Sequence, residues 1–147
     1  MKKEKAGKIK FREFETSLGT MVYAGKDESS NEKVVEQALP QELLIHTEAP
    51  GSPFCNIKSN NPTQEDIYEA AVFCVKYSQA WKKAKKKKDV PMNVFYKRDT
   101  NKEKGMKTGC FGVSKMKKLI IKKEDIEEFE KDLNDAKKCI DEEKNEN

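Results

Sequence analysis

The strongest secondary-structure signal in the chain is a helix that follows Pro62. Thr63 is a residue type that caps helix N-termini, and Glu65 and Asp66 stand where the helix dipole favours negative charge. Apolar residues then recur at helical spacing: Ile67, Ala70, Ala71, Phe73, Cys74, Tyr77 and Trp81. The pattern predicts one helix that continues to Trp81 and presents an apolar face to a small folded core.

Short strand-like segments lie on both sides of this helix. Residues 10–16 alternate apolar and charged side chains, and a turn at 17–20 separates them from 21–24, which predicts a hairpin. Six further elements are predicted from local patterns. One is a short helix with Val34, Val35, Ala38 and Leu39 on one side, ended by Pro40, and the others are strands at 42–46, 54–58, 92–96, 110–113 and 119–121. Strands mixed with single helices indicate an α+β fold with a mostly antiparallel or mixed sheet, one long helix and one short helix.

The last part of the chain has a different character. Ile126, Phe129, Leu133, Ala136 and Ile140 recur every three or four residues in an acidic segment, which predicts an amphipathic helix. Two heptads are too few for a coiled coil, so we expect this helix to dock on its own domain, with Asp141 to Asn147 frayed. The expected organisation is a flexible N-terminus at 1–7, one compact domain at 8–123, and an acidic helix and tail at 124–147.

Composition excludes several functional classes. The longest apolar run is Ala70 to Val75, too short to cross a membrane, and no apolar segment follows the basic N-terminus to form a secretory signal. The four cysteines form no C-x-x-C pair, and His46 is the only histidine, so no metal or other cofactor is expected. We expect reduced thiols and a cytoplasmic location.

Charge is distributed unevenly along the chain. The net charge of +4 conceals a segment, 76–123, with 17 basic and 3 acidic residues, between flanks of −3 and −7. Six lysines lie within 82–88, and ten more basic residues follow between Lys97 and Lys123. If these residues lie on one face, they would bind a polyanion with an affinity that depends on salt. An isolated lysine run can also be the solvated end of a helix, where the helix dipole favours positive charge. Tyr77 and Trp81 could stack on unpaired bases or belong to the core.

No catalytic residue can be assigned from the motifs. The glycines at 105 and 109 lack the order of a phosphate-binding loop, so nucleotide hydrolysis is not expected, although a turn that aims Lys104 and Lys107 at phosphates fits. His46 and Ser52 could be imagined as a base and a nucleophile, but neither an orienting acid nor oxyanion donors can be identified.

Several short motifs occur in an order that resembles one known family. In sequence they are Phe11-Arg12-Glu13-Phe14, Gly19, Gly25-Lys26-Asp27, Asn31-Glu32, His46-Thr47, Pro50-Gly51-Ser52, Lys58, Glu69-Ala70-Ala71, Tyr77-Ser78-Gln79-Ala80-Trp81 and the segment from Lys104-Gly105 to Gly109. This order, over residues 8–122, resembles the NFACT RNA-binding domain, a module of ribosome-quality-control proteins. Those relatives carry an N-terminal globular domain and long coiled coils, and Pro53 stands where they can have a histidine, so the chain looks like a stand-alone version.

The resemblance implies a non-enzymatic module that binds tRNA or ribosomal RNA in translation or ribosome quality control. With the lysine-rich segment, the expected RNA-binding residues are Arg12, Lys26, Asp27, Asn31, His46, Ser52, Lys58, Tyr77, Ser78, Trp81, Lys85, Lys86, Lys87, Lys88, Lys97, Arg98, Lys104 and Lys107. One alternative is an enzyme or enzyme subunit that processes or modifies tRNA, with His46 and Asp27 in its site. Another is an adaptor that reaches the ribosome or a protein partner through residues 124–147.

Overall fold

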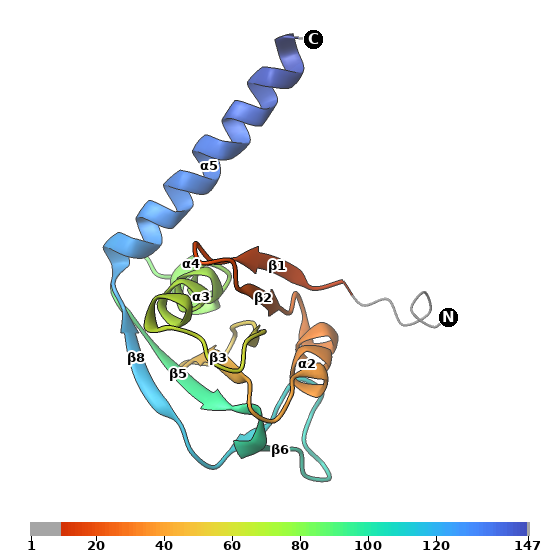
Figure 1. The fold of residues 1–147 in the computed structure, drawn as a ribbon. Helices are drawn as coiled ribbons and strands as arrows, with labels where there is room; N and C mark the ends of the chain where they lie inside the picture. The colour runs from red at the N-terminus through yellow and green to blue at the C-terminus, as the bar shows by residue number, and fades with distance from the viewer. Residues whose placement is uncertain (1–9, 147) are drawn as a thin grey trace.

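A six-stranded antiparallel sheet organises the fold in the order β1-β2-β4-β3-β5-β8 (Figure 1). The computed structural model describes residues 10–146, and the side chains of residues 10–138, so the expected flexible N-terminus at 1–7 lies outside the described residues. The strands are β1 (Arg12–Glu15), β2 (Met21–Ala24), β3 (Leu43–Thr47), β4 (Cys55–Ile57), β5 (Val90–Tyr96) and β8 (Lys117–Ile121). After a short 3-10 helix at Lys97–Asp99, β6 (Thr100–Asn101) pairs with β7 (Gly112–Val113). The α+β prediction is confirmed.

One face of the sheet is covered by helices α3 (Gln64–Lys76) and α4 (Gln79–Lys82). Helix α3 begins at a capping box, in which Thr63 accepts from the Asp66 backbone and Asp66 accepts from the Thr63 backbone. Its fully buried Ala70, Ala71, Cys74 and Val75 belong to the main core. From the sheet, that core receives Val22, Ala24, Ile45, Cys55, Ile57, Met92 and Ile121. Burying a side chain of the larger kinds stabilises the fold by about 1.5–3 kcal/mol each.

The prediction of one continuous helix to Trp81 is wrong. Helix α3 ends at Lys76, and Ser78 begins α4 as its N-cap, accepting a hydrogen bond from the Trp81 N–H at 3.2 Å. The Ser78 hydroxyl also donates to the Val75 carbonyl at 2.7 Å, so this small polar residue satisfies both helix ends. The break still leaves Trp81 against the core, which is why the apolar periodicity runs through it.

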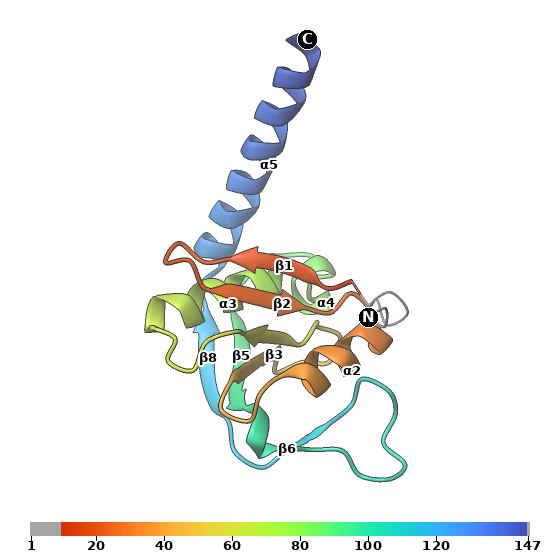
Figure 2. The same cartoon turned by 45° about the vertical axis from the view of Figure 1, so that its right-hand side comes forward.

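The opposite face carries helix α2 (Glu28–Gln37) and the β6–β7 pair (Figure 2). Val34, Val35 and Ala38 are buried in a second core cluster, which also holds Leu44, Phe54 and Phe95. Phe11, Phe111 and Val113 pack against it. The expectation that Leu39 shares the apolar side of this helix is wrong, because the helix ends at Gln37 and Leu39 is 49% exposed in the following turn.

Helix α5 (Lys123–Glu146) starts at the end of β8 and projects away from the sheet (Figure 1). Its first turns dock as expected, because Ile126 is fully buried and Phe129 packs beside Phe14 and Phe73. The docking stops there, since Leu133 is 39% exposed. Fraying from Asp141 onward stays a prediction. In the described part of the chain, no helix is long and apolar enough to span a membrane.

Candidate nucleic-acid interface

The lysine run lies in a loop and not on a helix. Helix α4 ends at Lys82, and Lys85, Lys86 and Lys88 are exposed in the loop between α4 and β5. A favourable helix dipole therefore does not explain these three charges. Lys87 differs from its neighbours, because its ammonium lies 4.5 Å from the centre of the Trp81 ring and donates to the Trp81 carbonyl. Lys87 fastens the loop to the domain and leaves the other lysines facing solvent.

Asp89 joins this loop to the end of strand β8. Its carboxylate accepts from the Lys123 N–H at 2.9 Å and lies 3.5 Å from the Lys122 ammonium. The hydrogen bond from Lys123 lowers the pKa of Asp89, and the Lys122 charge adds to the effect. Lys85 to Lys88 and Lys123 line a shared hollow of about 840 Å³ beside Asp89. Antiparallel pairing of Val90 with Ile121 is what places the two segments together.

Strand β8 extends the positive charge along an edge of the sheet. Lys117 and Lys118 lie on the strand, Lys115 precedes it, and all three are exposed. Lys118 pairs with Glu48, whereas no ion pair among the described side chains involves Lys115 or Lys117. We call the set of exposed lysines on the loop and this strand the basic edge; its members are Lys83, Lys85, Lys86, Lys88, Lys115, Lys117, Lys118 and Lys122.

The loop between β6 and β7 supplies a second, smaller group of charges. Lys104 and Lys107 are exposed near its tip, where Gly105 has a φ of +95° that a turn requires. Lys97 instead donates to the Ala38 carbonyl at 3.3 Å. Arg98 lies with its guanidinium 4.1 Å from the centre of the Tyr96 ring. In this group, Arg98, Lys104 and Lys107 have the exposure that a phosphate contact needs.

The base of the β6–β7 loop is tied to helix α2 through Glu32. Its carboxylate accepts from the Gly109 N–H at 2.6 Å and from the Lys102 ammonium at 3.0 Å. The Gly109 hydrogen bond lowers the pKa of Glu32, helped by Lys102. The charge of Lys102 is therefore paired within the domain, whereas Lys104 and Lys107 at the loop tip face solvent.

Many motif residues from the first half of the chain have structural partners. Asp27 caps α2 through Ser30, at 2.8 Å from the Ser30 N–H, and this bond lowers the pKa of Asp27. Asn31 accepts from the Phe54 N–H at 2.9 Å and so joins α2 to the strand region. Lys26 is exposed and follows Gly25 directly. Of these motif residues, Lys26 alone presents its charge to solvent without a described partner.

Two cations of the motif set are held inside the domain. Arg12 donates to the Gly25 carbonyl at 2.7 Å, and its guanidinium lies 4.2 Å from the centre of the Tyr77 ring. Lys58 donates to Glu42 at 2.8 Å and to Gln37 at 3.0 Å. Lys76 and Lys82 also lie near the Tyr77 ring, at 4.9 and 5.9 Å. Tyr77 is therefore surrounded by positive charge and half-buried, at the end of α3.

His46 lies half-buried on β3 and faces the side of the sheet that carries α2. Its ring is 4.5 Å from the Phe54 ring, and its Nδ1 is 2.7 Å from the Thr47 carbonyl oxygen. Burial lowers the pKa of His46, so the neutral ring is favoured near pH 7. The Ser52 hydroxyl donates to the Pro53 carbonyl at 2.9 Å, so these contacts do not form a base and nucleophile pair.

Three of the expected RNA contacts lie within the core. Ser52 is 7% exposed, Ser78 is fully buried, and Trp81 is 2% exposed. The Trp81 indole N–H donates to Glu130 of α5 at 3.0 Å, so this ring anchors the C-terminal helix. A nucleobase has no access to the Trp81 ring in this structure, and the core interpretation of this residue applies.

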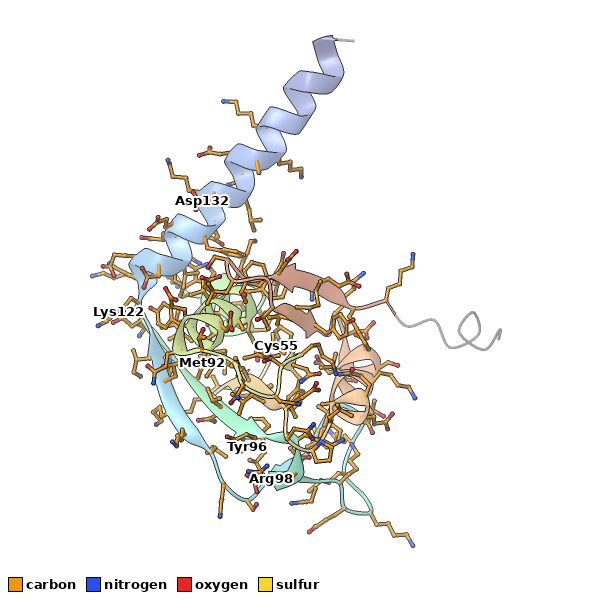
Figure 3. All side chains as sticks on the ribbon, viewed as in Figure 1. Cys55, Met92, Tyr96, Arg98, Lys122 and Asp132 are labelled. Atoms are coloured by element: carbon orange, nitrogen blue, oxygen red, sulfur yellow. The ribbon has the colours of Figure 1, made fainter. Side chains whose placement is uncertain are left out.

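The sequence pattern does not single out Tyr96, Lys115 and Lys117 as site residues, yet the fold brings them to one surface. Tyr96 is 39% exposed at the end of β5. Figure 3 places Tyr96 and Arg98 together near β6, whereas Lys122 lies beside the start of α5. The only available signal was the density of lysines between 97 and 123, which does not specify a face. Among the described residues, no group of three or more His, Cys, Asp or Glu side chains is placed to hold a metal ion.

A family model described as the NFACT protein RNA binding domain matches residues 10–115. The chain belongs to the NFACT RNA-binding domain family. Membership implies RNA as the partner, and the matched range contains the lysine loop, the β6–β7 loop and Lys115.

One solved structure shares the fold of this chain. It is the C-terminal part of the fibronectin/fibrinogen-binding protein from Streptococcus suis, which aligns with a TM-score of 0.70 at 20% identity. The alignment covers 78% of this chain and 46% of that one, so this chain spans about half of the solved structure. None of the curated proteins compared with the chain matches it.

Proposed function

We propose that this domain binds structured RNA, tRNA or ribosomal RNA, through the phosphates that face its basic edge. The observation that carries the proposal is the joining of the 85–88 loop to strand β8 through Asp89. This contact turns two separate lysine runs into one surface, whose exposed ammonium groups are matched to a polyanion. We further propose that the protein acts in translation or ribosome quality control in the cytoplasm, where the free thiols of Cys55 and Cys74 would stay reduced.

A protective role for the lysines explains part of this surface. Lysines on an edge strand such as β8 keep that strand from pairing with another chain. The same reason does not apply to Lys85, Lys86 and Lys88, because their loop has no strand edge to protect. A loop that holds three exposed lysines together repels itself, and a bound polyanion would relieve that repulsion.

Lysines act on phosphates as point charges, so the expected binding is sensitive to salt and tolerant of sequence. Each phosphate neutralised makes the slope of log K against log salt more negative by about 0.9 for a duplex and by about 0.7 for a single strand. Selectivity for structured RNA would come from the shape of the surface, because an A-form helix offers mostly backbone and 2′-hydroxyl groups.

The test measures binding of a mixed tRNA preparation by fluorescence anisotropy at several salt concentrations. The triple variant Lys85→Gln, Lys86→Gln, Lys88→Gln is compared with a control that removes three exposed lysines elsewhere: Lys33→Gln, Lys131→Gln, Lys137→Gln. Both lower the net charge by three. We expect the loop variant to bind tRNA at least 10-fold more weakly than the wild type, and its slope of log K against log salt to be less steep by about 2–3. The control variant should change both quantities much less. Equal effects, or no binding by the wild type at low salt, would refute the proposal.

The choice between tRNA and ribosomal RNA needs a separate experiment. Crosslinking followed by sequencing of the bound RNA identifies the partner, and recovery of messenger RNA alone would contradict the proposed one. Mass spectrometry of tRNA incubated with the protein tests the enzymatic alternative, which expects a product that His46→Ala abolishes.

A further inference from the structure

A groove lies on the α3 face of the sheet, beyond the part that helix α3 covers. It has a volume of about 960 Å³ and lies between the start of α3, strands β5 and β8, and residues 114–116. Its apolar walls include Ile67 of α3 and Val94 and Leu119 of the sheet. Tyr68 and Tyr96 are among its aromatic residues. A groove of this size that combines apolar walls with polar groups at its margin is typical of a ligand site.

Tyr68 and Tyr96 are held in place by different contacts. The Tyr68 hydroxyl donates to Asp125 at 2.5 Å and accepts from the Lys122 N–H at 3.1 Å, which leaves only its ring for the groove. Tyr96 is 39% exposed, and the Arg98 guanidinium stacks on its ring at 4.1 Å. A rigid tyrosine beside an arginine is an arrangement that favours stacking with another flat ring.

Positive charge surrounds the mouth of the groove. Lys115, Lys117 and Lys118 line it, and Arg98 lies next to it through Tyr96. Lys118 is paired with Glu48, whereas the described side chains include no ion partner for Lys115 or Lys117. Asp99 is the one acidic residue of the lining. The occupant that fits is therefore flat and apolar at its centre and anionic at its margin.

We propose that this groove holds an unpaired nucleobase of a bound RNA. The base lies against Tyr96 and the apolar wall formed by Val94 and Leu119, and its flanking phosphates lie against Lys115 and Lys117. The proposal rests on the RNA-binding function proposed above and adds to it a place where single-stranded RNA is distinguished from duplex. In a duplex both faces of each base are stacked, so only an unpaired base can offer a face to Tyr96.

The proposed position of the base agrees with the location of the groove at one end of the basic edge. An RNA whose backbone follows β8 from Lys122 toward Lys115 passes the mouth of the groove. The phosphate contacts then position the chain, and the groove selects strands with an unpaired nucleotide at that point. Gln64 and Ser114 lie in the lining and offer polar groups to the edge of the base.

The test compares two RNA probes by fluorescence anisotropy, a 12-nucleotide single strand of adenosines and a 12-base-pair duplex. Tyr96→Ala removes the stacking surface, and Tyr96→Phe keeps it. Leu39→Ala is the control, because Leu39 is 49% exposed in the turn after α2 and is not in the lining of the groove. We expect Tyr96→Ala to bind the single strand about 10-fold more weakly and the duplex within twofold of wild type. Tyr96→Phe and Leu39→Ala should match the wild type on both probes.

Three outcomes would overturn the proposal. If the wild type binds both probes and Tyr96→Ala changes the affinity for neither, or weakens both equally, the groove has no role in base binding. The proposal that RNA binds at the basic edge is then unaffected. If wild type binds neither probe, both proposals fail. If light scattering shows a wild-type dimer that Tyr96→Ala dissociates, the groove holds a second copy of the chain.

A crosslinking measurement on the wild type removes any dependence on how the variants fold. Irradiation with a 4-thiouridine-labelled single strand, followed by peptide mapping, should place the crosslink within 94–99 or 115–119. A crosslink confined to 82–88 would overturn the proposed position of the base.

Discussion

Asp66 ties the first turn of α3 to the β1–β2 turn, and its replacement has a calculable effect. The carboxylate accepts from the Thr16 hydroxyl at 2.7 Å, from the Thr20 hydroxyl at 3.1 Å and from the Thr63 N–H at 3.2 Å. Asp66 and Thr16 are each 4% exposed, so Asp66→Ala leaves a buried hydroxyl without its acceptor. Each hydrogen bond to a charged group contributes about 1.5–3 kcal/mol, but the three are not additive.

We therefore expect Asp66→Ala to lower the free energy of unfolding by about 3 kcal/mol, which lowers the Tm by roughly 10 °C in a domain of this size. Urea unfolding followed by the fluorescence of the only tryptophan, the buried Trp81, measures the change. Glu65→Ala is the matched control, because Glu65 is exposed in the same turn. It should lose only a few tenths of a kcal/mol from the helix dipole.

The effect of Asp66→Ala should depend on pH with a defined sign. The hydrogen bond from Thr16, followed by those from Thr63 and Thr20, lowers the pKa of Asp66 in the folded state. The ionised carboxylate therefore stabilises the fold above the unfolded pKa of about 3.9, and this contribution is lost as pH falls through the lower folded value. The stability gap between wild type and variant should narrow below about pH 4. A gap under 0.5 kcal/mol at pH 7, or one that is constant from pH 7 to pH 2.5, would refute the reasoning.

Two further predictions concern other features of the fold. A methyl group on Gly25 would lie 2.1 Å from Asn31 Oδ1 and 2.8 Å from the Asn31 backbone, so Gly25→Ala should lower the free energy of unfolding, measured in urea, by about 1–3 kcal/mol. Gly105 lies in open space, so Gly105→Ala should lower it only by the roughly 1 kcal/mol that a left-handed φ costs. Equal losses in the two variants would count against the close contact at Gly25. Burial lowers the pKa of His46, so protonation opposes folding and the Tm should fall as pH drops below about 6.5. His46→Gln should flatten that dependence between pH 7.5 and pH 5, and an unchanged slope would exclude His46 as its origin.

Local signals were reliable where the interaction is itself local. The predicted cap at Thr63 requires only a neighbour three residues away, and the structure contains it. The same reasoning failed at Ser78, because apolar periodicity continues through a break when both helix pieces face one core. The placement of Leu39 was wrong because the helix ends at Gln37, and Leu39 lies exposed in the turn that follows.

The sequence locates the segment where positive charge is concentrated, but it does not show which of these charges face solvent. Residues such as Arg12 and Lys58 have charges that suit RNA, yet the structure gives them partners inside the domain. Sequence cannot distinguish a cation with an internal partner from one that faces solvent, because the partner lies on another element. Tyr96 gave no signal, since one tyrosine in a strand pattern indicates only a strand.

The sequence by itself determined the α+β class, the family and the concentration of positive charge in 76–123, because these depend on composition, local periodicity and motif order. Only the tertiary structure decided where on the surface that charge lies. Pairing of β5 with β8 places the 85–88 loop against Lys122 and Lys123, and it leaves Lys115 and Lys117 at an edge beside an uncovered groove. Both results come from contacts between segments about 30 residues apart, which no local pattern encodes.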